Sequence, residues 1–170
     1  MATVAHVLTD AFERIRQTVH SAVDGLDEDQ LAFRVDDDAN SIAWLVWHLS
    51  RVQDDHVADL ADREQRWIAG GWAEQFDLPF PEEAHGYGQS SADVAAVRVG
   101  ADLLLDYYDE VHEHTLGYVR ALHDADLDRV VDEAWDPPVT VGVRLMSVVN
   151  DDLQHAGQAS FVRGVVLRRG

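Results

Sequence analysis

Residues 90–122 read SSADVAAVRVGADLLLDYYDEVHEHTLGYVRAL, and this segment carries the clearest helical pattern in the chain. Its apolar and aromatic residues recur at steps of three and four positions, which is the spacing of one face of an α-helix. Members of this stripe are Val94, Val97, Ala101, Leu104, Tyr108, Val111, Thr115, Tyr118 and Leu122. Ser90 and Asp93 have the spacing of an N-terminal capping box. The segment therefore predicts one long amphipathic helix of the kind that packs in helical bundles.

Three further segments show the same periodicity, and no segment shows a convincing strand pattern. They cover residues 3–24, 41–62 and 140–163, with capping residues before the second and two prolines before the third. Residues 63–90 hold glycines, prolines and five aromatic residues, which indicates a long connection that packs over part of the bundle. We therefore expect an all-α fold in a single domain over residues 1–170. Its architecture is predicted to be a four-helix bundle with a long crossover connection between the second and third helices.

The composition excludes several classes of function. The chain has 170 residues, 32 acidic and 13 basic, a formal net charge of −19, no cysteine and no lysine. Disulfide bonds, cysteine ligands and lysine Schiff bases are therefore ruled out. The charge disfavours nucleic acids and anionic membranes as partners, and no segment has the apolar length of a membrane-spanning helix. Because the N-terminus also lacks the pattern of a signal peptide, we expect a cytoplasmic protein.

The last helical segment, residues 140–163, carries acids and a histidine in the middle of its apolar face. Burial of an unpaired carboxylate or imidazole costs several kcal/mol, and a bound cation would offset that cost. Asp151 and His155 are four residues apart, and Asp152 and His155 are three apart, so either acid could share one ion with the histidine. Asp152 lies deeper in the stripe, and the spacing alone leaves both acids open as ligands.

The second helical segment offers a further ligand. His48 lies in mid-helix among apolar residues, so it could join His155 and an acid if the two helices are neighbours. Two histidines and one carboxylate leave coordination positions open for water or substrate, which is typical of catalytic metal sites. His56 lies on the same face about 12 Å further along the helix, too far to share the ion, and is expected to line a cavity. The alternative is a buried histidine bonded to an acid, without any metal.

Two motifs together resemble the signature of the DinB-like superfamily, which includes the metal-binding domain of mycothiol-dependent maleylpyruvate isomerase. They are WLVWHL at residues 44–49 and DDLQHAGQ at residues 151–158, and the resemblance covers essentially the whole chain. It implies a four-helix bundle, commonly a homodimer, with a divalent metal, often zinc or nickel. By position the ligands would be His48, Asp151 and His155. Asp151 stands where relatives have His or Glu, which keeps Asp152 open as a substitute.

The resemblance also implies chemistry with a low-molecular-weight thiol, because relatives transfer mycothiol or bacillithiol to electrophiles. A metal lowers the pKa of a bound thiol, so the absence of cysteine fits a nucleophile that arrives with the cosubstrate. Because only seven residues follow Arg163 in this sequence, we do not expect the isomerase's additional domain. A thiol S-transferase is therefore favoured, with mycothiol as the thiol. The alternatives are a non-catalytic metal-binding bundle that acts as a binding or stress-response module, and a metal-dependent hydrolase.

Four more residues of the last segment have predicted roles. Gly157 would permit close approach of a neighbouring helix, and Gln158 would either orient a ligand histidine or be an ordinary surface residue. Arg144 and Arg163 are expected to form surface ion pairs, with binding of a substrate carboxylate as the alternative.

Overall fold

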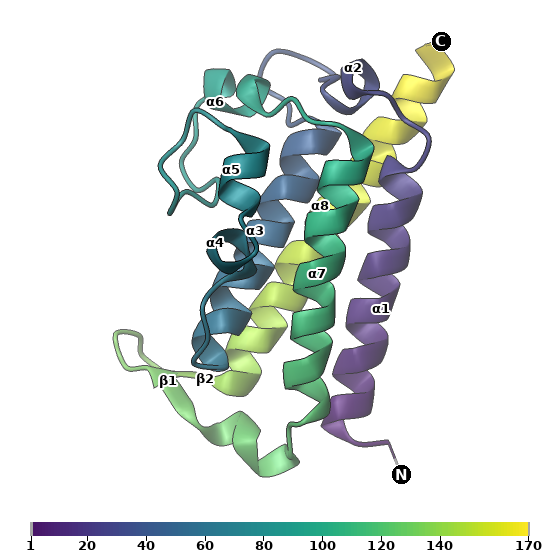
Figure 1. The fold of residues 1–170 in the computed structure, drawn as a ribbon. Helices are drawn as coiled ribbons and strands as arrows, with labels where there is room; N and C mark the ends of the chain where they lie inside the picture. The colour runs from purple at the N-terminus through teal and green to yellow at the C-terminus, as the bar shows by residue number, and fades with distance from the viewer. Residues whose placement is uncertain (1, 170) are drawn as a thin grey trace.

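The computed structural model describes residues 2–169 and shows a bundle of four long helices (Figure 1). The long helices are α1 (Val4–Val23), α3 (Ile42–Leu60), α7 (Ala101–Arg120) and α8 (Val141–Arg169). The short helical elements are α2 (Glu28–Leu31), α4 (Arg66–Ala69), α5 (Trp72–Phe76), α6 (Ser91–Ala96) and the 3-10 helix η1 (Asp124–Asp128). Within residues 2–169, none of these helices has the length and apolar character needed to span a bilayer.

The four long helices are arranged so that α1 and α3 lie on opposite corners of the bundle. Each of them packs against both α7 and α8. In Figure 1, α1 and α8 run upward, whereas α3 and α7 run downward. Because α3 and α7 are neighbours that run in the same direction, the chain between them has to return along the whole bundle. The predicted all-α four-helix bundle with a crossover connection is therefore confirmed.

The crossover segment, residues 61–100, packs along the outside of α3 and α7 and is held by buried polar contacts. The carboxylate of Asp54 on α3 accepts hydrogen bonds from the backbone N–H groups of Arg66 and Trp67, at 2.8 and 2.7 Å, and from the Tyr107 hydroxyl at 3.0 Å. Four of the five aromatic rings of the segment pack against the bundle, as predicted, and only Tyr87 is exposed. The Trp67 ring, for example, lies 5.2 Å from that of Tyr107. With α7, α8 and this segment around it, α3 is buried over almost its entire surface.

The helix predicted over residues 90–122 is interrupted, so the prediction of a single element is wrong. The chain leaves the helix at residues 97–100, between α6 and α7. Val97 and Val99 are both buried, and this two-residue alternation is the pattern of extended chain. Gly100 then stands at the N-cap of α7. Because Val97 also fits the helical stripe, the periodicity alone did not reveal the break.

Two other differences concern the last connection. A small antiparallel hairpin, β1 (Val130–Asp132) and β2 (Val139–Thr140), precedes α8, although no strand pattern is visible in these residues. Strands of two or three residues are too short for alternation to be visible. α8 also continues to Arg169 instead of ending at Arg163, and Gly164 lies within the helix. Thr140 caps the N-terminus of this helix, since its hydroxyl accepts a hydrogen bond from the Val143 N–H at 3.3 Å.

Candidate metal centre

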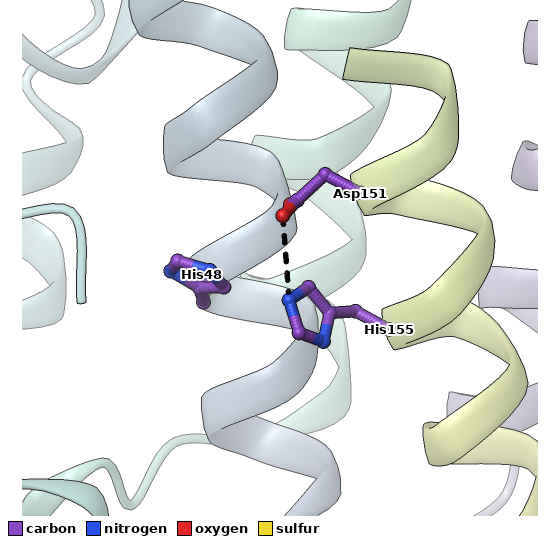
Figure 2. A group of neighbouring side chains, drawn as sticks. All are labelled: His48, Asp151 and His155. Carbon is purple, nitrogen blue, oxygen red and sulfur yellow. Dashed lines mark ion pairs between the residues drawn. The ribbon is translucent and has the colours of Figure 1, made fainter. Parts of the chain in front are cut away.

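The packing of α3 against α8 brings three of the predicted residues together (Figure 2). His48, Asp151 and His155 each offer one ligand atom, and these atoms lie within 4.8 Å of one another. Within residues 2–169 this is the only such group of three or more His, Cys, Asp or Glu side chains. His48 is buried and the other two are half-buried, so the cluster lies at the rim of the core with one side accessible. Donors this close can surround an ion with ligand bonds of about 2.0–2.2 Å.

Hydrogen bonds fix the tautomers of both imidazoles. The Nδ1 of His48 bonds to the backbone carbonyl oxygen of His85, and the Nδ1 of His155 bonds to Gln158 Oε1 at 2.9 Å. Carbonyl and amide oxygens only accept hydrogen bonds, so both Nδ1 atoms carry the proton. Both Nε2 atoms are then left with a lone pair for a ligand bond, which is the arrangement that metal-binding histidines have in proteins. Gln158 is exposed, and its contact with His155 agrees with the predicted role of orienting a ligand histidine.

The structure places Asp151, and not Asp152, beside the histidines. Asp151 Oδ1 lies 3.5 Å from His155 Nε2 (Figure 2). The second oxygen of Asp151 is buried and has no hydrogen-bond partner among the described residues. Asp152 is fully buried in the core near Tyr108 of α7, and neither of its oxygens has a partner in the same part of the chain. The apolar stripe thus predicted the burial of Asp152 correctly. At this position, however, the buried face of α8 packs against the core and not against the histidines.

The electrostatics of the cluster suit a divalent cation. Burial lowers the pKa of His48, so this imidazole is neutral at pH 7. Burial alone would raise the pKa of Asp151, but the hydrogen bond and charge of His155 outweigh it and lower the pKa below its usual value. Burial would lower the pKa of His155, and its bonds to Asp151 and Gln158 reverse that effect and raise it. The cluster therefore combines an ionised carboxylate with two imidazoles that can present lone pairs.

Aromatic side chains and the crossover segment enclose His48. The Trp44 ring stacks on His48, with centroids 4.7 Å apart and an angle of 12° between the planes. Tyr87 of the crossover segment lies 6.1 Å from the same imidazole, at a steep angle. Between them the backbone of Gly86 approaches so closely that a Cβ there would lie 2.5 Å from His48 Nδ1. Gly86 also has a φ of +104°, so glycine is required at this position for two independent reasons.

The sequence did not reveal the part that the crossover segment plays in the cluster. The backbone carbonyl of His85 has no side-chain signature, and no spacing rule connects it to His48. The available signal was the pair Gly86 and Gly88 on either side of Tyr87, since closely spaced glycines often mark a tight backbone approach.

The remaining predicted residues lie outside the cluster. His56 lies beside Arg144, whose Nη1 is 3.5 Å from the His56 Nδ1, and not beside His48. Arg144 also pairs with Asp132 of β1 at 3.4 Å, in agreement with the ion pair that was expected. Arg163 instead donates to a backbone carbonyl of α1 at 3.3 Å. The prediction for Gly157 is wrong, because a Cβ at this position would have no atom within 4 Å.

Comparison with known proteins connects this geometry with a family. The model of the family described as mycothiol S-transferase matches residues 7–167. Among solved structures, the chain is similar to a conserved protein from Enterococcus faecalis, with a TM-score of 0.92 and 27% sequence identity over 98% of this chain and 99% of that one. No curated protein is similar enough to the chain to count as a match. The family match confirms the DinB-like resemblance that the two sequence motifs indicated.

Proposed function

Because this chain belongs to the mycothiol S-transferase family, we propose that it is a divalent-metal-dependent thiol S-transferase. It would join a low-molecular-weight thiol, with mycothiol favoured, to an electrophilic substrate. The observation that carries the proposal is the cluster of His48, Asp151 and His155, whose two Nε2 atoms are both left free by hydrogen bonds at Nδ1. These three side chains would hold the ion, and zinc and nickel both accept imidazole and carboxylate ligands.

The residues fit a divalent ion on a further observation. Asp151 Oδ2 is buried without a partner among the described residues, although the carboxylate is ionised at neutral pH. A cation beside it would satisfy an oxygen whose burial is otherwise costly. Three protein ligands also leave a coordination position for an exogenous group, as catalytic sites require.

The chemistry needs an activated thiol, and the chain itself has no cysteine. A divalent ion in the site supplies this activation, because it lowers the pKa of a thiol that occupies the open position. The protein contributes the rigid placement of the donors. Gln158 holds the His155 ring at Nδ1, while the His85 carbonyl and the stacked Trp44 ring hold His48.

We propose further that the protein acts as a homodimer through the outer face of α8. Exposed apolar residues follow one another on this face at helical spacing: Val143, Met146, Leu153, Phe161 and Leu167. The two acids of α8 lie in the cluster and in the core, so this face is free of the negative charge that would keep two copies of a −19 chain apart. In light scattering, the wild type should then have the mass of a dimer and Phe161→Glu the mass of a monomer. A monomeric wild type, or a variant with the same mass as a dimeric wild type, would contradict the proposal.

We propose the cytoplasm as the location, because the reaction needs a reduced thiol and the cytoplasm keeps thiols reduced. A tagged chain expressed in its own cells should therefore be found in the cytoplasmic fraction, and recovery outside that fraction would contradict this location.

Metal analysis tests the site, and turnover tests the reaction. Protein reconstituted with Zn²⁺ or Ni²⁺ should hold equimolar metal, and the His155→Ala variant should hold much less. With mycothiol and monochlorobimane, the reconstituted wild type should form the conjugate and the metal-free protein should not. Substoichiometric metal in the wild type would overturn the site. Bound metal without turnover across several thiols would favour a binding module, and ester hydrolysis without thiol would favour a hydrolase.

A further inference from the structure

Arg51 is a buried cation for which the proposed reaction has no direct use. It lies on α3 one turn after His48 and is 1% exposed. Burial of a guanidinium is costly unless hydrogen bonds and opposite charge compensate for it. The Asp54 carboxylate is 3.9 Å from the Arg51 Nη1, and that carboxylate already accepts three hydrogen bonds from other groups. The compensation for Arg51 therefore has to come largely from elsewhere.

The guanidinium of Arg51 is directed at the crossover segment. Its Nε donates to the carbonyl oxygen of Ala84 at 3.2 Å, and its Nη2 reaches the carbonyl oxygen of Glu82 at 3.5 Å. Its Nη1 donates to Gln65 Oε1 at 2.8 Å, and the cation stands 4.8 Å over the Trp67 ring. Two of its partners are thus backbone carbonyls just before the residue that contacts His48.

These contacts connect Arg51 with the orientation of His48. The carbonyl that accepts from His48 Nδ1 belongs to His85, the next residue after Ala84. Arg51 and His48, one turn apart on α3, therefore donate hydrogen bonds to the carbonyl groups of two consecutive residues of the crossover segment. Because Arg51 fixes the position of residue 84, it also fixes the carbonyl that sets the tautomer and the direction of the His48 ring.

We propose that Arg51 is a positioning residue of the metal centre: it anchors residues 82–85 so that the His85 carbonyl keeps His48 Nε2 directed at the ion. This inference rests on the proposed function, because it assumes that the cluster binds metal. Loss of the anchor leaves all three ligands in place but frees the ring of His48. The expected effect is a rise of roughly 10- to 100-fold in the Kd for the metal, the range found for partners of metal ligands.

Arg51→Met is the test variant, because methionine keeps an unbranched apolar stem and removes every N–H donor. Arg66→Met is the matched control. Arg66 also anchors the crossover segment, but it does so through an ion pair with Glu110 of α7 and is half-buried. Arg51→Lys is the second variant if Arg51→Met does not fold; it keeps the charge but cannot donate to both carbonyls, so a weaker effect is expected.

Two measurements are made on each variant, and unfolding temperature is recorded as a control for stability. The Kd for Zn²⁺ is obtained by competition with a chromophoric chelator. The tautomer of His48 is read from the ¹⁵N resonances of its imidazole in metal-free protein. Arg51→Met should raise the Kd by roughly 10- to 100-fold and remove the signature of a single Nδ1-protonated His48. Arg66→Met should lower the unfolding temperature and change neither measurement.

Three results distinguish failure of this inference from failure of the proposed function. A wild-type Kd and a wild-type His48 signature in Arg51→Met overturn the inference, and so do equal losses in Arg51→Met and Arg66→Met. A wild type that binds no metal overturns the proposed function and the metal-positioning role together. In that case the His48 resonances show whether Arg51 still controls the ring.

Discussion

Gly86→Ala adds a single methyl group at the point where the crossover segment meets His48. The new Cβ would lie 2.5 Å from His48 Nδ1 and 3.1 Å from Trp44 Cζ2. The imidazole cannot swing aside, because the Trp44 ring is stacked on it. The segment therefore has to move outward, and the carbonyl of His85, one residue earlier, moves with it.

The magnitude has two parts that can be separated. A non-glycine residue at a positive φ costs about 1–3 kcal/mol of stability. Loss of the hydrogen bond to His48 should weaken metal binding roughly 10- to 100-fold, which is about 1.4–2.8 kcal/mol. Gly88 provides the control, because its φ is +71° and a Cβ there would have no atom within 4 Å. Gly88→Ala carries the backbone cost without the clash at the imidazole.

Thermal unfolding of the metal-free proteins and Zn²⁺ competition titrations measure the two parts. Both variants should unfold at a lower temperature than the wild type, and only Gly86→Ala should show a raised Kd. The reasoning is refuted if Gly86→Ala binds Zn²⁺ as the wild type does, or if Gly88→Ala loses the same affinity. Either result would mean that contact with the crossover segment does not control His48.

Three further predictions concern α8. Burial raises the pKa of Asp152 well above its ordinary value, so the carboxyl destabilises the fold increasingly as pH rises above about 3.9. In urea unfolding, Asp152→Asn should therefore stabilise the metal-free protein by about 1–3 kcal/mol at pH 7. This gain in stability should vanish near pH 3. An equal stability of variant and wild type at pH 7 would contradict the prediction. Gln158→Leu should weaken Zn²⁺ binding about tenfold through His155. Gln154→Leu should not, because the Gln154 side chain bonds to the backbone carbonyl of Asn150 and to no ligand. Equal effects of the two substitutions would disprove the role of Gln158. Burial lowers the pKa of His155, but bonds to Asp151 and Gln158 outweigh it and raise the pKa above about 6.5, so metal affinity should increase with pH through this region as the proton is displaced. An affinity that does not change between pH 6 and 8 would be inconsistent with His155 as a ligand.

Long amphipathic segments were predictable because one face of each is buried along many turns. The segment predicted at residues 3–24 is α1 at Val4–Val23, and the capping box at Ser90 and Asp93 is present. The break after α6 was not predictable, since Val97 is buried in either a helix or an extended chain. The short hairpin before α8 was not predicted, because strands of two or three residues are too short to show the two-residue alternation of a strand.

In the candidate site too, contacts within one helix were predictable and contacts between elements were not. Asp151 and His155 could be paired from the sequence because helix geometry alone places residues four apart on one side. The choice between Asp151 and Asp152 could not be made, because both lie near the buried stripe and only the packing of α3 shows which side faces His48. A backbone carbonyl such as that of His85 leaves no trace in a sequence. Arg51 did leave one, as the single arginine of α3, and only the contacts in the folded structure show what it does.

The two histidines of the cluster are oriented by different parts of the fold. His155, Asp151 and Gln158 share one helix, so their arrangement exists as soon as α8 is formed. His48 depends on a carbonyl 37 residues further along the chain, which is in place only when the crossover segment has docked. An ion that needs both would bind the docked form alone and stabilise it by about 2.7 kcal/mol at a concentration one hundred times its Kd. The rate of proteolysis within residues 61–100 would then fall as the available metal rises, and the chain would persist longest in cells that supply the ion.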